Sequence, residues 1–579
     1  MKADSRHCRN EEGETDNLTT RVEAVGAGQI AEPNDRHWEF LSRGLLISLA
    51  LVILTTFLDY GLTFDEEFGK TYGQYVVRWY SSFFRDRSAL GYYNLHLYGG
   101  FFEAVSQLAA SVIQQILPIG VYELRHIFNA FTGLLGVWAI YKLGAEVLNR
   151  KAGFFAALFL IVTPGFYGQI FNDSKDIPFA AFSSVALFYM FRSYKQLPAV
   201  SGGLIVGLGV SIGATLGVRI GGIILLGYLL AFWLTWLLAE RANGLVGGRR
   251  LAVVTVKLAG GFTLIALIAW SMMLIWWPWA QLSPIRHPLA ALKAMAHFRW
   301  PLTVFFDGEF IPGGALPWTY LPVWVLISLP EFYFITVALG FLLAIRLLIT
   351  GRKSGESEQL IKISLLVLTI VLPTMSALIL RPTLYDGLRQ FLFILPSASV
   401  LAAICFVSFL SSPANKYIKM GAGVAVLISV SLTIVNMVEL HPYEYVYFNR
   451  VFGGGLRSAA ERFETDYWGS SYREGAEWVI NNYRPNSAQP IRVAHCGLPF
   501  LIRYFFEKTG NLRQRFMVVK PDENPDIYLA ITRWQCHKVF EGKVIYTVQR
   551  QQTPLLFVIE VKGSYRPEVL MRKAKGFSW

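Results

Sequence analysis

Long apolar segments recur along most of this chain, and they constrain its fold more than any other feature. Each is close to the roughly 20 apolar residues needed to cross about 30 Å of hydrocarbon. About eleven can be placed, with an error of one or two. They lie near residues 45–58, 121–141, 153–170, 177–193, 201–218, 220–239, 252–276, 323–346, 362–380, 390–410 and 420–438. The sequence therefore predicts a polytopic α-helical membrane protein.

Composition and charge placement agree with this class. Of 579 residues, 54% are hydrophobic and only 16% charged, too apolar for one soluble globule. A net charge of +13 alone would suit nucleic-acid binding, but the basic residues cluster in short loops between apolar segments. These are Lys142, Arg150, Lys151, Arg241, Arg249, Arg250, Arg346, Arg352, Lys353, Lys362, Lys416 and Lys419. This positive-inside pattern predicts a cytoplasmic N-terminus, an external C-terminal region and no nucleic-acid partner.

Changes in composition divide the chain into three parts. Residues 1–44 are polar and predict a disordered cytoplasmic tail without a cleavable signal peptide. Residues 45–440 form the transmembrane part. Residues 441–579 predict an external α/β domain. Its strand-like runs are 491–493, 527–531, 543–548 and 555–561, and its clearest helical stretch is 472–482.

Two external segments, 59–120 and 277–322, are too long to be simple connectors. The first includes a stretch at 101–117 whose mixed apolar and polar residues suggest a helix lying in the membrane interface. The second is rich in Trp, Pro and Gly, which is typical of a membrane surface. Long loops on one side indicate that the external face is the working face.

An acidic cluster follows the first apolar segment. Asp65, Glu66 and Glu67 stand at the start of the first external loop. Carboxylates are costly near hydrocarbon, so such a cluster is either a solvated loop or a working site.

A second charged cluster, Asn172-Asp173-Ser174-Lys175-Asp176-Ile177-Pro178, forms the tight turn after the third segment. It reads in part as a capped helix start, with an acidic or Ser side chain as the cap and Pro178 in the first turn. Capping uses one residue, however, and leaves Lys175 unexplained.

Basic residues on the external face indicate an anion. Arg381 and Arg389 flank the loop after the ninth segment, Arg125 and His126 open the second, and Arg219 lies between the fifth and sixth. External arginines run against the positive-inside pattern, and a guanidinium fork matches phosphate oxygens. Carboxylates that take a proton from a hydroxyl, beside cations that neutralise a phosphate leaving group, suit a lipid-phosphate donor.

The chain resembles the GT-C superfamily of polyprenyl-phosphate-sugar-dependent glycosyltransferases, within the protein mannosyltransferase and aminoarabinose transferase group (family 39 type) of bacteria. The motifs that carry the resemblance are Asp65-Glu66, the 172–178 turn and residues 389–396. It covers residues 45–440 and is strongest over 59–195.

The resemblance implies Asp65 as the catalytic base with Glu66 beside it, and Lys175 and Arg389 as phosphate contacts. We expect further donor contacts from Asp173, Asp176, Arg219, Arg381, Arg125 and His126. The stretches 441–449 and 463–469 resemble bacterial members rather than the eukaryotic mannosyltransferases.

The predicted function is inverting transfer of a sugar from a polyprenyl-phosphate donor to a hydroxyl of a lipid, glycan or protein acceptor, among the lipids of a bacterial inner membrane. A transporter or flippase of a lipid-linked sugar is the main alternative, and a structural protein is a third. No cofactor and no metal site are predicted, and assistance by a divalent cation is left open. The sequence also leaves open whether Cys496 and Cys536 pair.

Overall fold

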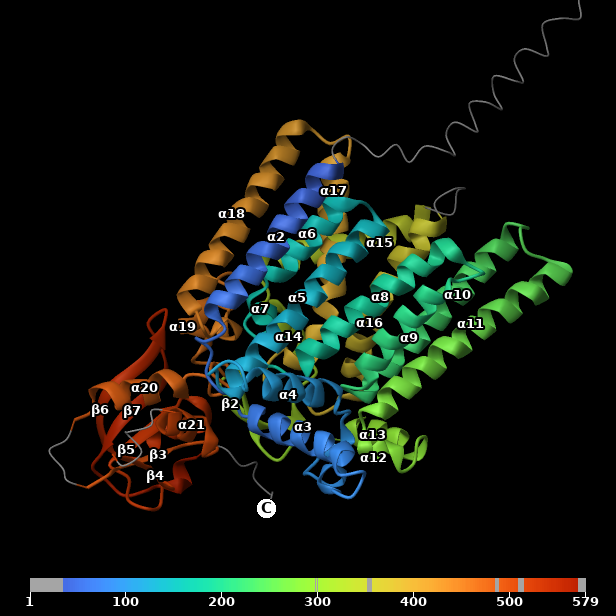
Figure 1. Cartoon of the computed structure of the whole chain (residues 1–579). Helices are drawn as coiled ribbons and strands as arrows, with labels where there is room; N and C mark the ends of the chain where they lie inside the picture. Colours follow the sequence, from blue (N-terminus) through green and yellow to red (C-terminus); the bar gives the residue numbers. More distant parts are fainter. Residues whose placement is uncertain are drawn as a thin grey trace, which may run out of the picture.

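The computed structural model describes residues 35–570 except 297, 299, 351–356, 485–488 and 509–514. A bundle of long helices makes up most of it, and a smaller sheet-containing part packs at one end of the bundle (Figure 1). The predicted fold class, a polytopic helical protein with a C-terminal α/β part, is confirmed. Residues 1–34 of the predicted tail lie outside the described residues.

Eight helices of the described part are long and apolar enough to cross a membrane. They are α2 (Asp35–Thr56), α5 (Val121–Val147), α10 (Ile224–Ala242), α11 (Gly248–Ile275), α15 (Glu331–Thr350), α16 (Ser357–Leu380), α17 (Leu395–Ser411) and α18 (Lys416–Leu440). Of the apolar window that includes α17, 83% is buried, against 17% in α2, α11 and α18. The first therefore lies in the bundle core, and the other three offer their surfaces to lipid.

The other three predicted segments are also helical, but their helices are too short or not apolar enough to be counted among these eight. They form α6 (Arg150–Ile161), α8 (Asp176–Ser193) and α9 (Gly202–Leu216). The first ends early because Thr163, which precedes Pro164, is held in an extended conformation before the short helix α7 (Pro164–Tyr167). The prediction of about eleven apolar helical segments thus locates every long helix of the bundle.

The two long loop segments lie at the same end of the bundle as the C-terminal part (Figure 1). They contain α3 (Glu66–Ser81), α4 (Phe101–Ile113), α12 (Pro278–Gln281) and α13 (Arg286–Ala296), and the hairpin β1 (Thr303–Phe306) and β2 (Glu309–Pro312). Val105, Leu108 and Val112 form an exposed apolar stripe on α4, which suits a membrane interface. The connection from α10 to α11 lies at the opposite end, and it is flanked by Arg241 in the last turn of α10 and by Arg249 and Arg250 in the first turn of α11.

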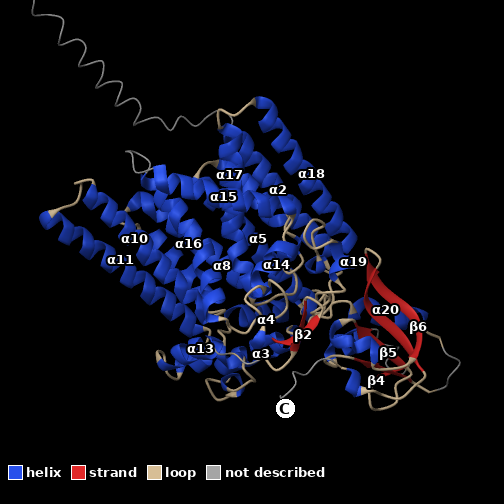
Figure 2. Ribbon diagram, turned by 180° about the vertical axis from the view of Figure 1, so that it is seen from behind, coloured by secondary structure: helices blue, strands red, loops and turns tan. Residues whose placement is uncertain are grey.

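The C-terminal part is built on a five-stranded sheet in the order β4-β3-β5-β7-β6 (Figure 2). Its strands are β3 (Ile491–His495), β4 (Phe516–Val518), β5 (Ile527–Ile531), β6 (Gly542–Arg550) and β7 (Thr553–Val561). The first three are parallel, whereas β7 is antiparallel to both β5 and β6. All five residues of β5 are buried because helices cover this central strand. These helices include α20 (Tyr472–Asn482), beside α21 (Phe500–Lys508).

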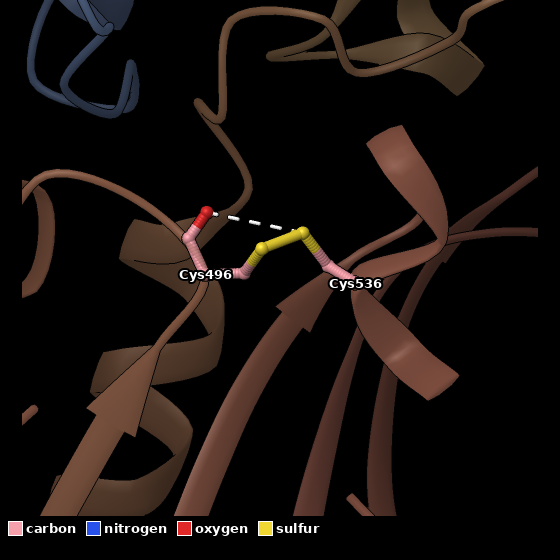
Figure 3. The surroundings of a disulfide bond; sticks show 2 residues. All are labelled: Cys496 and Cys536. Atoms are coloured by element: carbon pink, nitrogen blue, oxygen red, sulfur yellow. Dashed lines mark hydrogen bonds between the residues drawn. A yellow bond between two sulfur atoms is a disulfide. The ribbon is translucent and has the colours of Figure 1, made fainter. Parts of the chain in front are cut away.

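A disulfide joins Cys496 to Cys536, with 5.9 Å between the two Cα atoms (Figure 3). It ties the segment after β3 to the segment after β5. Both segments leave the carboxyl ends of neighbouring parallel strands, the edge at which α/β sheets commonly bind ligands. The structure thereby answers the question of pairing that the sequence leaves open.

Candidate active site

A cavity of about 400 Å³ lies where the helical bundle meets the C-terminal part. Of the charged side chains in the described residues, four cations and two carboxylates line it. They are Lys175, Arg219, Arg389 and Arg533, and Asp65 and Asp386. The lining therefore carries an excess of two positive charges, which favours an anionic ligand.

Asp65 immediately precedes α3 and lines the cavity with a side chain that is 39% exposed. Its Oδ2 accepts a hydrogen bond from Nη1 of Arg389 at 2.9 Å. Partial burial raises the pKa of Asp65, but Arg389 and Lys175 outweigh it and lower the pKa to about 2. Asp65 is therefore a carboxylate throughout the neutral pH range.

Arg389 is the centre of the ionic cluster. It begins the short 3-10 helix η6 (Arg389–Ile394), which leads into α17. Besides Asp65, its guanidinium lies 3.5 Å from Asp386 and 3.6 Å from Asp176. It also lies 4.9 Å from the ring centroid of Trp468, in cation–π geometry. Its side chain is buried, so these carboxylates compensate a charge that would otherwise be costly there.

The charged residues of the 172–178 turn have two kinds of surroundings. Asp173 and Asp176 contact neighbouring protein groups, and Lys175 lines the cavity. Asp173 Oδ1 accepts hydrogen bonds from the backbone N–H groups of Lys175 and Asp176 at 3.1 and 2.8 Å, and so caps the start of α8. Asp176 Oδ1 lies 2.5 Å from Nη1 of Arg219. Lys175 has no ion-pair partner within 4.0 Å among the described residues. Its Nζ lies 5.4 Å from the ring centroid of Tyr98, on the cavity wall.

The interpretation of this turn as a helix cap therefore holds for Asp173. Capping does not explain Lys175, which lines the cavity. Burial and the neighbouring Asp176 raise the pKa of Asp173 above its usual range. Asp173 therefore has a structural role, and Lys175 is the residue of this turn that lines the cavity.

Six residues predicted for the site do not line the cavity: Asp173 and Asp176 of the 172–178 turn, and Glu66, His126, Arg125 and Arg381. Glu66 is buried, with Oε1 2.6 Å from Nε2 of His126 and Oε2 accepting the backbone N–H of Thr63 at 2.7 Å. Glu66 and His126 therefore satisfy each other and fix the start of α3.

Arg125 and Arg381 also lie outside the cavity lining. Arg125 is ion-paired with Glu103, whose Oε1 also accepts a hydrogen bond from Ser174 at 2.7 Å, so it supports the turn from behind. Arg381 is exposed beyond the end of α16 and lines a small crevice beside Trp318. The exposed position lets water, rather than a bound anion, solvate its charge.

The C-terminal part contributes side chains that sequence reasoning missed. Arg533 follows β5, and its Nη2 lies 2.5 Å from Oδ1 of Asp386, while its Nε lies 3.2 Å from Oε1 of Glu464. Trp534 also lines the cavity. The signal for both was their position directly after a buried parallel strand.

Glu464 yields a pH-dependent prediction. Burial raises its pKa to about 7, Arg533 opposes the shift and Asp386 adds to it. Because an unfolded Glu ionises near 4.5, the folded state should lose stability as pH rises from about 4.5 through about 7. We expect the unfolding temperature, followed by circular dichroism, to fall over this range, and to fall less in Glu464→Gln. Parallel curves for the two proteins would contradict this.

Comparisons with known proteins bear on part of the chain. Residues 123–276 match the family model described as dolichyl-phosphate-mannose-protein mannosyltransferase. Over 131 residues the chain is 36% identical to dolichyl-phosphooligosaccharide-protein glycotransferase 1 of Pyrococcus horikoshii. The resemblance to the GT-C superfamily is confirmed. The match covers 20% of this chain and only 13% of that relative. The segment that matches the family model, residues 123–276, contains the 172–178 turn and Arg219, but neither Asp65 nor Arg389.

Solved GT-C structures resemble the chain more distantly. Archaeoglobus fulgidus AglB, in complex with an inhibitory peptide and a dolichol-phosphate, is 13% identical with a TM-score of 0.47. That match covers 86% of this chain and 70% of the archaeal one. Cupriavidus metallidurans ArnT, bound to undecaprenyl phosphate, is 16% identical with a TM-score of 0.45, over 89% and 97% of the two chains.

Proposed function

We propose that this multi-pass membrane protein is an inverting glycosyltransferase. It transfers a sugar from a polyprenyl-phosphate donor to an acceptor hydroxyl at the end of the bundle that carries the C-terminal part. The observation that carries this proposal is one cavity in which Asp65 faces Lys175, Arg219 and Arg389.

The proposed reaction is a single displacement. The acceptor oxygen attacks the anomeric carbon and forms the new glycosidic bond while the bond from that carbon to the phosphate oxygen breaks. The leaving polyprenyl phosphate keeps the electron pair, and Asp65 takes the acceptor proton. Lys175, Arg219 and Arg389 stabilise the charge that develops on the phosphate.

Binding of the donor would also activate the base. With Arg389 at 2.9 Å and a pKa of about 2, the Asp65 carboxylate is a weak base. A donor phosphate competes with Asp65 for this guanidinium. Loss of the ion pair raises the pKa of Asp65 toward a value better suited to proton transfer.

Two observations support an external site. Disulfides persist in oxidising compartments, and Cys496–Cys536 lies beside the cavity. The α10–α11 connection, which is flanked by arginines, lies at the other end of the bundle, as expected for a cytoplasmic loop. We therefore propose that the site lies on the external face of the membrane.

An alkaline phosphatase fusion tests this orientation. Fused after Trp579, the enzyme should be active, because it folds only in the oxidising compartment. Inserted between α15 and α16, it should be inactive. The reverse pattern would overturn the assignment.

Transport of a lipid-linked sugar is the rival function. Transporters place charged sites near the middle of the membrane, at broken helices. In this protein the ionic cluster lies at the ends of α8 and α17, beside the C-terminal part. Proteoliposomes with labelled polyprenyl-phosphate sugar and a membrane-extract acceptor separate the two. A transferase moves the label out of the polyprenyl fraction, and a transporter changes only the leaflet that holds it.

Lys175→Met should weaken binding of polyprenyl phosphate by about 10–100-fold, the loss expected for one charge-assisted contact. Its charge faces the cavity without a carboxylate partner among the described residues, so its removal strands no buried acid. Lys543→Met, on an exposed position of β6, is the matched control and should bind normally. Equal affinity of the Lys175 variant and the control, by titration in nanodiscs, would remove Lys175 from the donor site.

A further inference from the structure

A second cavity, of about 420 Å³, adjoins the first. It lies between the β1–β2 hairpin, the 457–465 segment and the carboxyl end of β5. Arg533 and Trp534 line both cavities and so form part of a shared wall. Its volume falls within the range of small-ligand sites.

The lining of this second cavity combines flat apolar faces with groups that form hydrogen bonds. Phe310, Phe463 and Phe557 supply rings, and Glu464, Thr532 and His537 supply a carboxyl, a hydroxyl and an imidazole. Three basic and two acidic side chains line it, an excess of one positive charge against two in the first cavity, so it favours an anion less than the first cavity does. Such a lining matches a ligand with apolar ring faces and many hydroxyl groups.

The shared wall is held in a costly conformation. Trp534 and Gln535 are consecutive residues with φ of 53° and 60°, in the left-handed region that non-glycine residues rarely adopt. Three tethers hold them: the ion pairs of Arg533, the hydrogen bond from Trp534 Nε1 to the Thr303 carbonyl at 3.1 Å, and the disulfide at Cys536. Strain maintained by such tethers is concentrated at functional sites.

The wall also contacts the residues around the base. The ring of Trp534 lies 6.2 Å from that of Phe64, the residue before Asp65. Arg533 pairs with Asp386, which lies 3.5 Å from Arg389. A ligand in the second cavity therefore lies against the structure that positions both the base and the phosphate contacts.

We infer that the second cavity binds a saccharide part of the acceptor, next to the donor cavity. This inference rests on the proposed function and narrows its acceptor from lipid, glycan or protein to one that carries a sugar. A cavity of about 420 Å³ with ring faces and hydroxyl partners fits a sugar ring better than an extended peptide, which needs a groove or a free strand edge.

The test uses the purified full chain in nanodiscs. Saturation-transfer difference NMR is recorded with maltose, lactose and N,N′-diacetylchitobiose, and with a Ser/Thr-containing hexapeptide. Phe310→Ala and Phe557→Ala remove ring faces of the cavity, and Phe452→Ala, an exposed ring outside it, is the control. Unfolding temperatures confirm that each variant is folded.

We expect at least one disaccharide to bind, and both cavity variants to bind it about tenfold or more weakly than the control. Binding of the peptide alone, of no disaccharide, or of a disaccharide equally well to all variants would overturn the inference. Polyprenyl phosphate is titrated into the same samples. Its failure to bind the wild type would count against the proposed function, whereas the disaccharide result bears on the second cavity alone.

Discussion

Replacement of Asp65 by Asn should reduce sugar transfer by about 10²–10⁴-fold, the usual cost of losing a general base. The amide keeps the shape of the side chain but cannot accept the proton of the acceptor hydroxyl. Polyprenyl phosphate should bind no more weakly than to the wild type, because Arg389 loses a carboxylate that competes with the phosphate. Initial rates with a labelled donor, together with donor affinity, measure both effects.

Asp59→Asn is the matched control for this variant. Asp59 lies six residues earlier, is exposed and does not line the cavity, so transfer should remain close to the wild-type rate. Near-normal transfer by Asp65→Asn would assign proton removal to another group. A parallel loss of donor binding would instead indicate a role for Asp65 in the frame of the site.

Arg533→Met should destabilise the junction between the bundle and the C-terminal part by about 3–5 kcal/mol. The guanidinium is 4% exposed and pairs with Asp386 and Glu464, which are 6% and 1% exposed. Its removal leaves Glu464 without its ion-pair partner and Asp386 with Arg389 alone. The unfolding temperature in detergent should fall by roughly 3–4 °C, and transfer should fall with it because Asp386 also contacts Arg389.

Arg462→Gln breaks a comparable but solvated pair. Arg462 and Asp307 are 58% and 57% exposed, so its loss should cost at most about 1 kcal/mol. If Arg533→Met unfolded at the same temperature as Arg462→Gln, the buried ion pairs could not be what joins the two parts of the protein.

Much of the fold could be predicted from local patterns. The bounds of β5 and α20 coincide with the predicted 527–531 and 472–482, because β5 is a short continuous apolar run and α20 is an amphipathic helix with a clear period. The strand β4 was missed because it has only three residues, too few for any periodicity. The early end of α6 depends on the conformation before Pro164 rather than on hydropathy, so the predicted segment was too long.

The site could be predicted where its residues sit at the ends of apolar segments. Lys175, Arg219 and Arg389 were found because the positive-inside pattern places these ends on one face, and the structure brings them to one cavity with Asp65. Their roles stay predictions. Glu66 does not line the cavity, because adjacent residues at the start of a helix point in different directions. The Arg533–Asp386 pair joins residues 147 positions apart, a contact that no local pattern reveals.

The most direct test of the account is release of polyprenyl phosphate from its sugar-linked form by purified protein in vesicles with a membrane-extract acceptor. The wild type and Asp59→Asn should release it with stoichiometric transfer of the sugar, and Asp65→Asn should release it about 10²–10⁴-fold more slowly. Equal release by all three proteins, or sugar that changes leaflet while it remains attached to its polyprenyl phosphate, would contradict glycosyl transfer at this cavity.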